Sequence, residues 1–568
     1  MLKPVISRQK ADHKLSDAHS PLIQHILSNR GIREDHQLAQ GLDQLTDPFL
    51  MKGMRLAVDR LVEAKAQQEK IVIMGDFDAD GATSTALLMR AFQDLGFNAV
   101  SFFVPDRFTF GYGLSEQAVD AVFTQQTPDL LITVDNGISS IDGVKKANSL
   151  GLDVIVTDHH LPAQTLPNAL AIVNPNQPDC PFPHKTLAGV GVAFHLLIAL
   201  RKALKEAGEP IVNLAQYLDL VALGTVADLV PLDFCNRILV SQGLKRIRAG
   251  KTCEGIKQLL AVSKKDHRLT VSSDLSFSVA PKLNAAGRLE DMTQGIMLLL
   301  TDSEGFAADL AADLSQLNIE RRQIETKMQD EAEAILAELN IDESTLPKGL
   351  CLYHPDWHQG VVGLVASRLK EKYHRPVIIF AEDDEGHLKG SGRSITGIHL
   401  RDLLASMDAK NPSMIKAFGG HAMAAGLTLS SNNHDAFKKS FSEALDSVSE
   451  SHFQASWLSD GAIASKDFHL YTAKQIRDLL PWGQGMPEPL FDNTFVLKQF
   501  RVVGEKHLKL TLASQDNPSQ LLEAIWFFYD ETIELIKDRS YHCVYRLQVN
   551  YFRDNETLQL QIEQMVSG

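Results

Sequence analysis

Three apolar runs in the first part of the chain each end in an acidic residue. The runs are KIVIMG, LLITV and DVIVT, and they are followed by Asp76, Asp135 and Asp158. Helix-like stretches separate the runs, and this alternation predicts βαβ units that build a mostly parallel sheet covered on both faces. Open sheets of this kind bind ligands at the carboxyl ends of their strands. Three acidic strand ends therefore predict one site at a single edge of the sheet.

The stretch GDFDADG, which includes the end of the first run, places Asp76, Asp78 and Asp80 close together in the sequence. A calcium loop that starts at Asp76 is unfavourable, because its last position holds Leu87 where such loops need a glutamate. The letters DADGAT also approach the signature of phosphatases with an aspartyl nucleophile, the haloacid dehalogenase class. That alternative stays open, although it gives no role to the stretch TDHHLP at 157–162.

A pair of divalent cations explains the crowded carboxylates best. Two metals about 3.5–4 Å apart need a bridging carboxylate and flanking oxygen or imidazole ligands. Asp78 and Asp80 can each face one metal and Asp135 can bridge them. Asp228 and one histidine of the pair at 159–160 can complete a shell. Carboxylates with imidazole favour Mn²⁺ or Mg²⁺ over zinc. For any single aspartate the simpler alternative is a structural role, and Asp80 in particular is a candidate helix cap.

The rest of the chain predicts further domains, because 568 residues are too many for one hydrophobic core. Residues 187–250 look helical, and a long amphipathic helix over 305–339 is a candidate connector. A second α/β block follows over 349–448. From about residue 457 the pattern alternates between apolar and polar residues, as expected for antiparallel strands of a small barrel.

Composition sets the class of protein only broadly. The net charge of −15 argues weakly against a nucleic-acid partner, because the local potential of the binding cleft matters more than the total charge. The five cysteines are scattered and form no CxxC pair, which indicates a reducing compartment. The N-terminus lacks the apolar region of a signal peptide, and no apolar run is long enough to span a membrane. We therefore expect a cytoplasmic protein.

Taken together, the motifs resemble those of the DHH phosphoesterase superfamily. GDFDADG, VDNG at 134–137, TDHH at 157–160 and GTVADLVPL at 224–232 resemble its first four motifs. Further along, NAAGRLED, WHQGVVGLVASRL, GSGRS and GGHAMAAG resemble the later motifs of the RecJ exonucleases within that superfamily. This resemblance runs in order from about residue 70 to 430, and the barrel-like tail resembles the oligonucleotide-binding (OB) domain of RecJ.

The resemblance implies an α/β fold with two α/β domains, of DHH and DHHA1 type, joined by a long helix and followed by a C-terminal OB-like β-barrel. The implied organisation is an N-terminal segment packing on the core (1–69), a DHH catalytic domain (70–303), a connecting helix (304–345), a DHHA1 domain (346–452) and an OB-fold nucleic-acid-binding domain (453–568).

It also implies roles for the acidic and histidine residues. One metal, Mn²⁺ or Mg²⁺, would be held by Asp76, Asp78 and Asp135, and a second by Asp80, Asp135, His159 and Asp228. Asp76 alternatively orients a water on the metal. His160 would lie over the scissile phosphate, and Asp158 would fix the tautomer of a histidine.

The second α/β block would supply recognition of the 5′-phosphate. Arg393 and Ser391 of GSGRS can bind a phosphate, and Arg288 and the backbone amides of Gly420 and His421 are candidate partners. The alternative for GGHAMAAG is a close turn between a helix and a strand. Near the predicted metals, the aromatic residues of RFTFGYGL either stack on unpaired bases or pack in the core: Phe108, Phe110 and Tyr112.

The function implied is that of a single-stranded-DNA-specific 5′→3′ exonuclease in DNA recombination and repair, which releases 5′-mononucleotides by two-metal hydrolysis. The alternatives are an oligonucleotide or mononucleotide phosphoesterase of the same superfamily and a relative that binds DNA without cutting it. We expect a monomer that acts on single-stranded DNA and does not associate with a membrane. A single-strand-binding protein and a helicase are candidate protein partners.

Overall fold

The computed structural model describes residues 3–9, 11–106, 109–338, 346–383, 385–504, 506–529, 533–553 and 555–567. It divides into two compact units. Unit 1 consists of Met1–Pro281, Met292–Ala311 and Ser456–Gly568, and unit 2 of Lys282–Asp291 and Ala312–Ala455. Within the described residues, no helix is long and apolar enough to cross a membrane.

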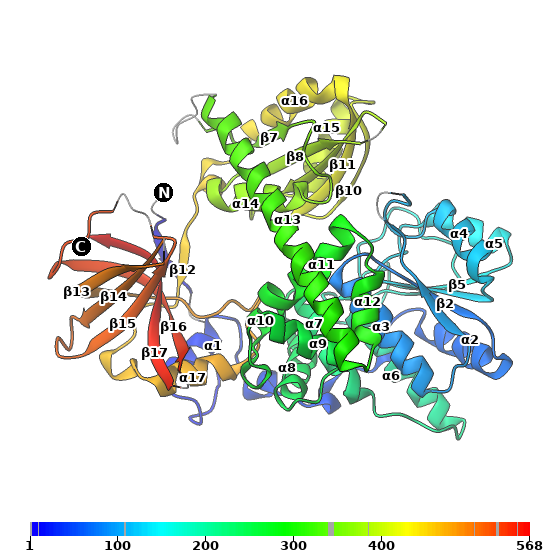
Figure 1. The fold of residues 1–568 in the computed structure, drawn as a ribbon, viewed down its shortest axis with the longest axis horizontal. Helices are drawn as coiled ribbons and strands as arrows, with labels where there is room; N and C mark the ends of the chain where they lie inside the picture. The colour runs from blue at the N-terminus through cyan, green and yellow to red at the C-terminus, as the bar shows by residue number, and fades with distance from the viewer. Residues whose placement is uncertain are drawn as a thin grey trace. The chain divides into compact units, whose positions relative to one another are not determined.

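The first part of unit 1 is built around a parallel sheet with strand order β3-β2-β4-β5-β6 (Figure 1). The predicted apolar runs form its central strands, β2 (Ile71–Gly75), β4 (Leu130–Val134) and β5 (Asp153–Thr157). Two shorter strands, β3 (Val100–Phe103) and β6 (Ala171–Val173), lie at the edges. Every residue of β2 and β4 is buried, because helices cover both faces of a parallel sheet.

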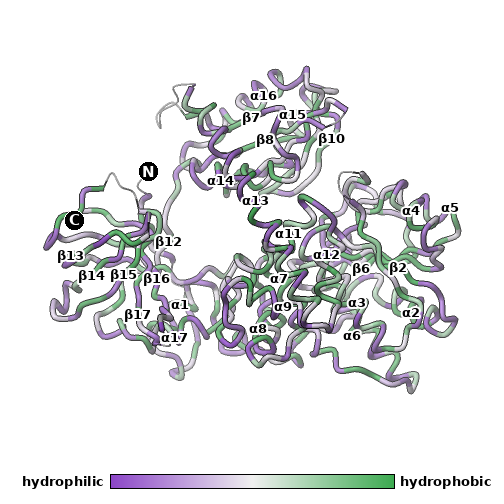
Figure 2. The backbone as a smooth tube through the Cα atoms, in the orientation of Figure 1, coloured by the Kyte–Doolittle hydropathy of each residue, from purple (hydrophilic) through white to green (hydrophobic). Residues whose placement is uncertain are grey.

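Helices α4 (Glu116–Gln126) and α5 (Ile141–Ser149) bury Val119 and Val144 against one face of this sheet. Helix α3 (Ala79–Asp94) contacts β2 and β3, and packs on α6 (Gly189–Glu206) and α7 (Leu218–Ala227). Figure 2 shows the apolar residues concentrated on inner elements such as β2, with polar residues on the outer loops. Helix α8 (Phe234–Arg248) follows α7, so the helical region predicted over 187–250 is confirmed.

Unit 1 also contains a closed five-stranded barrel, with strand order β13-β14-β15-β17-β16. The strands are β13 (Phe491–Val503), β14 (His507–Ser514), β15 (Leu521–Phe527), β16 (Ser540–Phe552) and β17 (Asn555–Ser567). Neighbours are antiparallel except β15 and β17, which pair in parallel and close the barrel. The predicted barrel is therefore present, and its strand order is that of an OB fold.

The N-terminal segment contacts both parts of unit 1. Strand β1 (Val5–Ser7) pairs with β12 (Trp457–Ser459), and Arg30, just after α1 (Pro21–Ser28), forms a buried ion pair with Asp460 at 2.8 Å. Helix α2 (Met54–Gln67) packs on α6 and β6.

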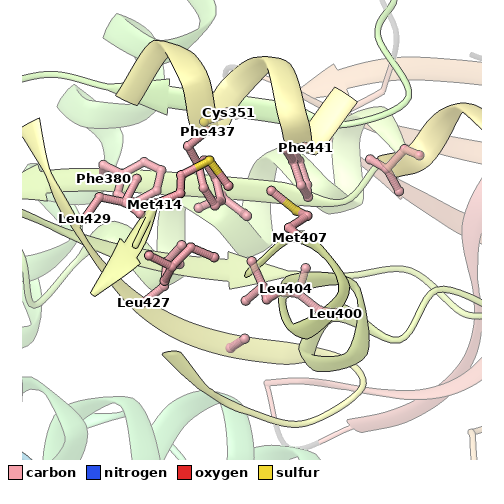
Figure 3. Close-up of a cluster of buried hydrophobic side chains, with 14 of the residues drawn as sticks. Cys351, Phe380, Leu400, Leu404, Met407, Met414, Leu427, Leu429, Phe437 and Phe441 are labelled. Atoms are coloured by element: carbon pink, nitrogen blue, oxygen red, sulfur yellow. The ribbon is translucent and has the colours of Figure 1, made fainter. Parts of the chain in front are cut away.

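Unit 2 is a mixed sheet with strand order β10-β11-β9-β8-β7. Strands β7 (Leu350–Tyr353) and β8 (Val377–Glu382) are parallel, and β9 (His387–Arg393), β10 (Ile415–Gly420) and β11 (Ala424–Ser430) continue the sheet in antiparallel order. Helices α14 (Val362–Tyr373), α15 (Leu400–Lys410) and α16 (His434–Asp446) complete the fold. Figure 3 shows Phe437 and Phe441 of α16 in the core with Met407 of α15.

The long helix predicted from the sequence is α13 (Glu304–Glu338), which contributes residues to both units. The end of the predicted connector, 339–345, lies outside the described residues. The stretch GGHAMAAG is the turn between β10 and β11, so the alternative that it joins a helix to a strand is wrong.

Candidate metal centre and phosphate-binding residues

The three aspartates that follow β2 make different contacts. Asp78 is the N-cap of α3, and its Oδ1 accepts the backbone amides of Asp80 at 2.9 Å and Gly81 at 3.0 Å. The expectation that Asp80 is the helix cap is therefore wrong. Asp76 lies one residue beyond the end of β2 and is buried.

Asp80 is held by the start of a helix that is distant in sequence. Its two carboxylate oxygens accept the amides of Gly189 at 2.7 Å and Val190 at 2.9 Å, at the N-terminus of α6. Glycine is required there, because a Cβ atom at position 189 would lie 2.6 Å from Oδ1 of Asp135. Burial, followed by the charge of Asp228, raises the pKa of Asp80 to about 7.

Asp135, directly after β4, is almost fully buried and has a left-handed backbone with φ of 63°. Burial, then the charge of Asp80, raises the pKa of Asp135 well above its ordinary value. Its Oδ1 lies 3.2 Å from Nε2 of His159. Both atoms are buried, and neither makes a hydrogen bond of good geometry. Two such atoms facing each other indicate a missing third group, which a cation fits.

Asp228 occupies the C-cap of α7. The end of a helix dipole at this terminus is negative and disfavours a carboxylate, so capping does not explain this residue. Its Oδ2 lies 3.4 Å from Nε2 of His159. Burial, followed by the charge of Asp78, raises the pKa of Asp228 to about 7. The sequence correctly placed Asp228 where a helix gives way to a loop.

The potential ligand atoms fall into overlapping groups whose members lie within 4.8 Å of one another. One group is Asp76, Asp78 and Asp135, and another is Asp80, His159 and Asp228. Carboxylates with one imidazole are the donors that suit Mn²⁺ or Mg²⁺. The raised pKa values of Asp80, Asp135 and Asp228 are caused first by burial and then by the neighbouring negative charges, and a bound cation would offset both effects. The residues present therefore fit divalent cations.

His160 and Asp158 form a hydrogen-bonded pair, and a ring nitrogen of His160 also lies within 4.8 Å of potential ligand atoms of Asp135 and His159. Oδ1 of Asp158 accepts from Nδ1 of His160 at 2.7 Å, and its Oδ2 accepts the amide of Ile138 at 2.9 Å. Burial alone would raise the pKa of Asp158, but the charge of His160 and these hydrogen bonds lower it to about 2. Burial alone would lower the pKa of His160, but Asp158 raises it to about 9. These interactions favour the imidazolium form of His160 in the metal-free protein.

Two asparagines that the sequence analysis missed hold the histidine backbone. Nδ2 of Asn174 donates to the carbonyl of His160 at 3.0 Å, and Nδ2 of Asn176 donates to the carbonyl of His159 at 2.6 Å. Both residues follow β6, the last strand of the parallel sheet. The available signal was the same as for the aspartates, namely polar residues directly after a buried strand.

Of the aromatic residues near the metals, Tyr112 lies at the site. Its hydroxyl is 3.3 Å from Nε2 of His160 and 3.4 Å from the carbonyl of Asp135, and 55% of the residue is exposed. Phe110 packs against Phe103 in the core of the sheet instead. Phe108 lies outside the described residues.

In unit 2, Arg393 ends β9 beside the start of α14. Its Nη1 donates to Oγ of Ser391 at 3.1 Å and to the carbonyl of Gly392 at 2.8 Å, and burial lowers its pKa. Among the described residues the structure gives this guanidinium no carboxylate partner. Position 363 on α14 must be small, because a Cβ atom there would lie 3.0 Å from Nη2 of Arg393. A partly buried arginine with hydroxyl and carbonyl partners only is a candidate anion site.

The other predicted phosphate-binding residues lie in the same unit. Arg393 pairs with Ala424 across β9 and β11, so the β10–β11 turn lies beside it. The amide of His421 donates to the carbonyl of Ala424 within that turn, and we therefore do not retain it as a phosphate donor. Gly420 has a φ of 138° and closes the turn. Nη1 of Arg288 donates to the carbonyl of Gly360, near the start of α14.

Three family models match the chain. They are the N-terminal domain of the DHH family over residues 70–225, the DHHA1 domain over 346–447 and the RecJ OB domain over 459–564. The parallel sheet with its acidic strand ends and the first two matches define the class, a DHH-type α/β protein with a DHHA1 domain.

Curated relatives narrow this class. The single-stranded-DNA-specific exonuclease RecJ of Dickeya dadantii (strain 3937) is 49% identical, over 98% of each chain. Its namesake from Escherichia coli (strain K12) is 48% identical, over 96% of this chain and 95% of the relative. The chain therefore belongs to the RecJ family of single-stranded-DNA-specific exonucleases. The family expected from the motifs is confirmed, and the dehalogenase-type alternative is wrong.

Solved structures agree with this assignment. The crystal structure of RecJ in complex with Mn²⁺ from Thermus thermophilus has a TM-score of 0.79 and 29% identity, and covers 99% of this chain and 80% of that one. The complex of RecJ with Mg²⁺ from the same organism has a TM-score of 0.74 and 28% identity, and covers 97% and 75%.

Proposed function

We propose that this exonuclease degrades single-stranded DNA from the 5′ end and releases 5′-mononucleotides, with two Mn²⁺ or Mg²⁺ ions held at the acidic cluster. The observation that carries the metal assignment is the buried, unsatisfied pair of Asp135 Oδ1 and His159 Nε2 among four further carboxylates, those of Asp76, Asp78, Asp80 and Asp228. The proposed ligands of the first ion are Asp76, Asp78 and Asp135, and those of the second are Asp80, Asp135, His159 and Asp228.

When bound, these cations supply Lewis acidity to a water nucleophile and to the scissile phosphate. The protein's own contribution is orientation and proton transfer. The imidazolium of His160 donates a hydrogen bond to an oxygen of the phosphate, and Asp158 keeps it charged and fixes its ring. The hydroxyl of Tyr112 lies close to both ring nitrogens of His160 and also restricts its position.

The polarity of digestion would come from unit 2. Arg393 and Ser391 are the proposed ligands of the terminal 5′-phosphate, with Arg288 as a further candidate. A guanidinium that lacks a carboxylate partner binds an added phosphate without having to break an ion pair. The 3′ end of such a strand carries a hydroxyl and no terminal phosphate, so it could not make this contact.

The test compares strands labelled at either end, with a 5′-phosphate or a 5′-hydroxyl, in Mn²⁺ and in EDTA. We expect release of 5′-mononucleotides from the 5′ end with Mn²⁺ only. Arg393→Ala should weaken the affinity for 5′-phosphorylated ends by about 1.5–3 kcal/mol, the scale of a charged hydrogen bond, and should reduce the preference for phosphate over hydroxyl.

Arg368→Ala is the matched control, because that arginine lies in the same unit but already pairs with Glu325. Digestion from the 3′ end by the wild type, or an Arg393→Ala variant with the full phosphate preference, would contradict the proposal. Mononucleotide phosphatase activity without digestion of long strands would support the phosphoesterase alternative.

A role in recombination and repair, a monomeric state, a cytoplasmic location and partnership with a single-strand-binding protein and a helicase stay predictions. Size-exclusion chromatography with light scattering tests the monomer, and pull-down from cell extract on immobilised single strands tests the partners.

A further inference from the structure

A π-helical segment, η6 (Leu275–Val279), presents an aromatic side chain to solvent in unit 1. Phe277 is 70% exposed, which is unusual for a phenylalanine. π-Helical turns are rare and occur frequently at functional sites. Because the ring is exposed, packing in the hydrophobic core does not explain its position.

The π-helical segment is fixed by three serine hydroxyls. Oγ of Ser276 donates to the carbonyl of Val226 at 3.0 Å, and Oγ of Ser263 donates to the carbonyl of Ser278 at 3.1 Å. Immediately before the segment, Oγ of Ser272 donates to the carbonyl of Trp482 at 2.6 Å. Phe277 is therefore carried by a backbone that is held to neighbouring elements, and is not the tip of a long loop.

One of these contacts places the segment beside the acidic cluster. Val226 lies on α7, two residues before Asp228. The hydrogen bond of Ser276, the residue before Phe277, therefore joins the π-helical segment to the last turn of the helix that ends at Asp228, a proposed metal ligand.

We propose that Phe277 stacks against a base of the single strand close to the acidic cluster. This inference rests on the proposed function. Every base has a flat π-face, so such a contact is compatible with a nuclease that reads no sequence. Bases inside a duplex are already stacked on both faces and are not available, so the contact favours single strands. It also adds affinity that does not depend on positive charge, in a protein of net charge −15.

The experiment measures binding of a fluorescent single strand to Phe277→Ala, Phe277→Leu and Phe277→Trp in EDTA at several salt concentrations. Because stacking of a base on an aromatic ring contributes to affinity, we expect the alanine variant to bind about tenfold more weakly. Leucine should recover little of this loss, and tryptophan should recover it fully. The slope of log Kd against log salt should stay unchanged, because no phosphate contact is removed.

Tyr471→Ala is the control, because Tyr471 is 69% exposed on α17 (Leu470–Leu479) of the same unit and has no proposed role. A strand with 2-aminopurine at successive positions from the 5′ end should show one position whose quenching is lost in Phe277→Ala. A change in the salt slope, equal binding by wild type and alanine variant, or full rescue by leucine would overturn the stacking role. Failure of the proposed function is seen separately, as absence of Mn²⁺-dependent digestion by the wild type.

Discussion

At the scale of single residues, Asp135 combines a left-handed backbone, a buried carboxylate and a neighbouring negative charge, and each of these is unfavourable. Its backbone is left-handed, a conformation that aspartate and asparagine adopt more readily than most residues. Its carboxylate is buried, and burial together with the charge of Asp80 raises its pKa. Without cations this carboxylate destabilises the folded protein, which indicates that it is retained for its chemistry.

Asp135→Asn should therefore stabilise the metal-free protein while removing its activity. Asparagine tolerates the left-handed backbone and carries no charge, so we expect the melting temperature in EDTA to rise by about 2–4 °C for each kcal/mol gained. Loss of the bridging carboxylate should lower single-strand hydrolysis by about 1000-fold or more. Thermal unfolding and a digestion assay measure the two effects.

The control is Asp120→Asn, because Asp120 lies in an exposed pair with Lys146. It should change neither quantity appreciably. An Asp135→Asn variant that melts at a lower temperature in EDTA, or that keeps near-normal turnover with Mn²⁺, would disagree with this account.

At the scale of elements, the N-terminal segment and the segment that leads into the barrel depend on each other. The side chains of Arg30 and Asp460 have exposures of 1% and 0%, and Asp460 also accepts the amide of Leu490. Burial would raise the pKa of Asp460, but its hydrogen bonds and the charge of Arg30 lower it. A deletion of residues 453–568 would remove Asp460 together with the barrel and so abolish this contact with the N-terminal segment, and it therefore tests stability as well as DNA binding.

Asp460→Ala should therefore be strongly destabilising. Breaking a buried ion pair by removing one partner costs about 3–5 kcal/mol, because the remaining charge is buried without compensation. Chemical denaturation followed by a probe in unit 1 measures the loss. Asp120→Ala, at the exposed pair with Lys146, should have little effect by comparison. Equal unfolding midpoints for the two variants would show that the buried pair contributes nothing.

At the scale of the whole molecule, the two candidate sites belong to different units. The acidic cluster lies in unit 1, and Arg393 lies in unit 2. Metal binding and phosphate binding should therefore have separable effects on stability. The pKa values of Asp80 and Asp228, both raised to about 7, connect metal binding in unit 1 to pH.

Raising the pH from about 5 to 8 should destabilise unit 1 of the metal-free protein. A carboxyl whose folded pKa is raised contributes stability below its ordinary pKa, and this contribution is lost as the pH rises through about 7. Mn²⁺ needs ionised carboxylates, so its stabilising effect should grow over the same interval. Hydrogen exchange read by mass spectrometry, with Mn²⁺ or EDTA at each pH, follows both units at once.

Unit 2 serves as the internal reference in that experiment. Peptides from β9 and β11 should show no Mn²⁺-dependent protection at any pH, whereas peptides around Asp78 and Asp135 should be protected most at about pH 8. Protection that is the same at the two ends of the pH range, or that extends equally to unit 2, would argue against a metal centre made of these carboxylates.

The parallel sheet and its acidic edge could be predicted from the sequence. Buried strands and the helices between them are encoded by local apolar patterns, and the carboxyl ends of parallel strands meet at one edge by geometry. Asp76, Asp135 and Asp158 therefore were predictable as neighbours without any knowledge of packing. The barrel and the long helix were predictable for the same reason, because their periodicity is local.

The groups that these side chains contact could not be predicted from the sequence, because they depend on packing between distant segments. The amide of Gly189 that holds Asp80 lies 109 residues away in the sequence, and no local pattern encodes that approach. The same applies to the hydroxyl of Ser276 on the carbonyl of Val226, 50 residues apart. The hydrogen bond that the His421 amide makes within its own turn could not be predicted from the sequence either, because hydrogen-bond partners depend on the packed backbone. Residue types and their periodicity set where charges gather, whereas packing between distant segments sets which hydrogen bonds and which burial each charge receives.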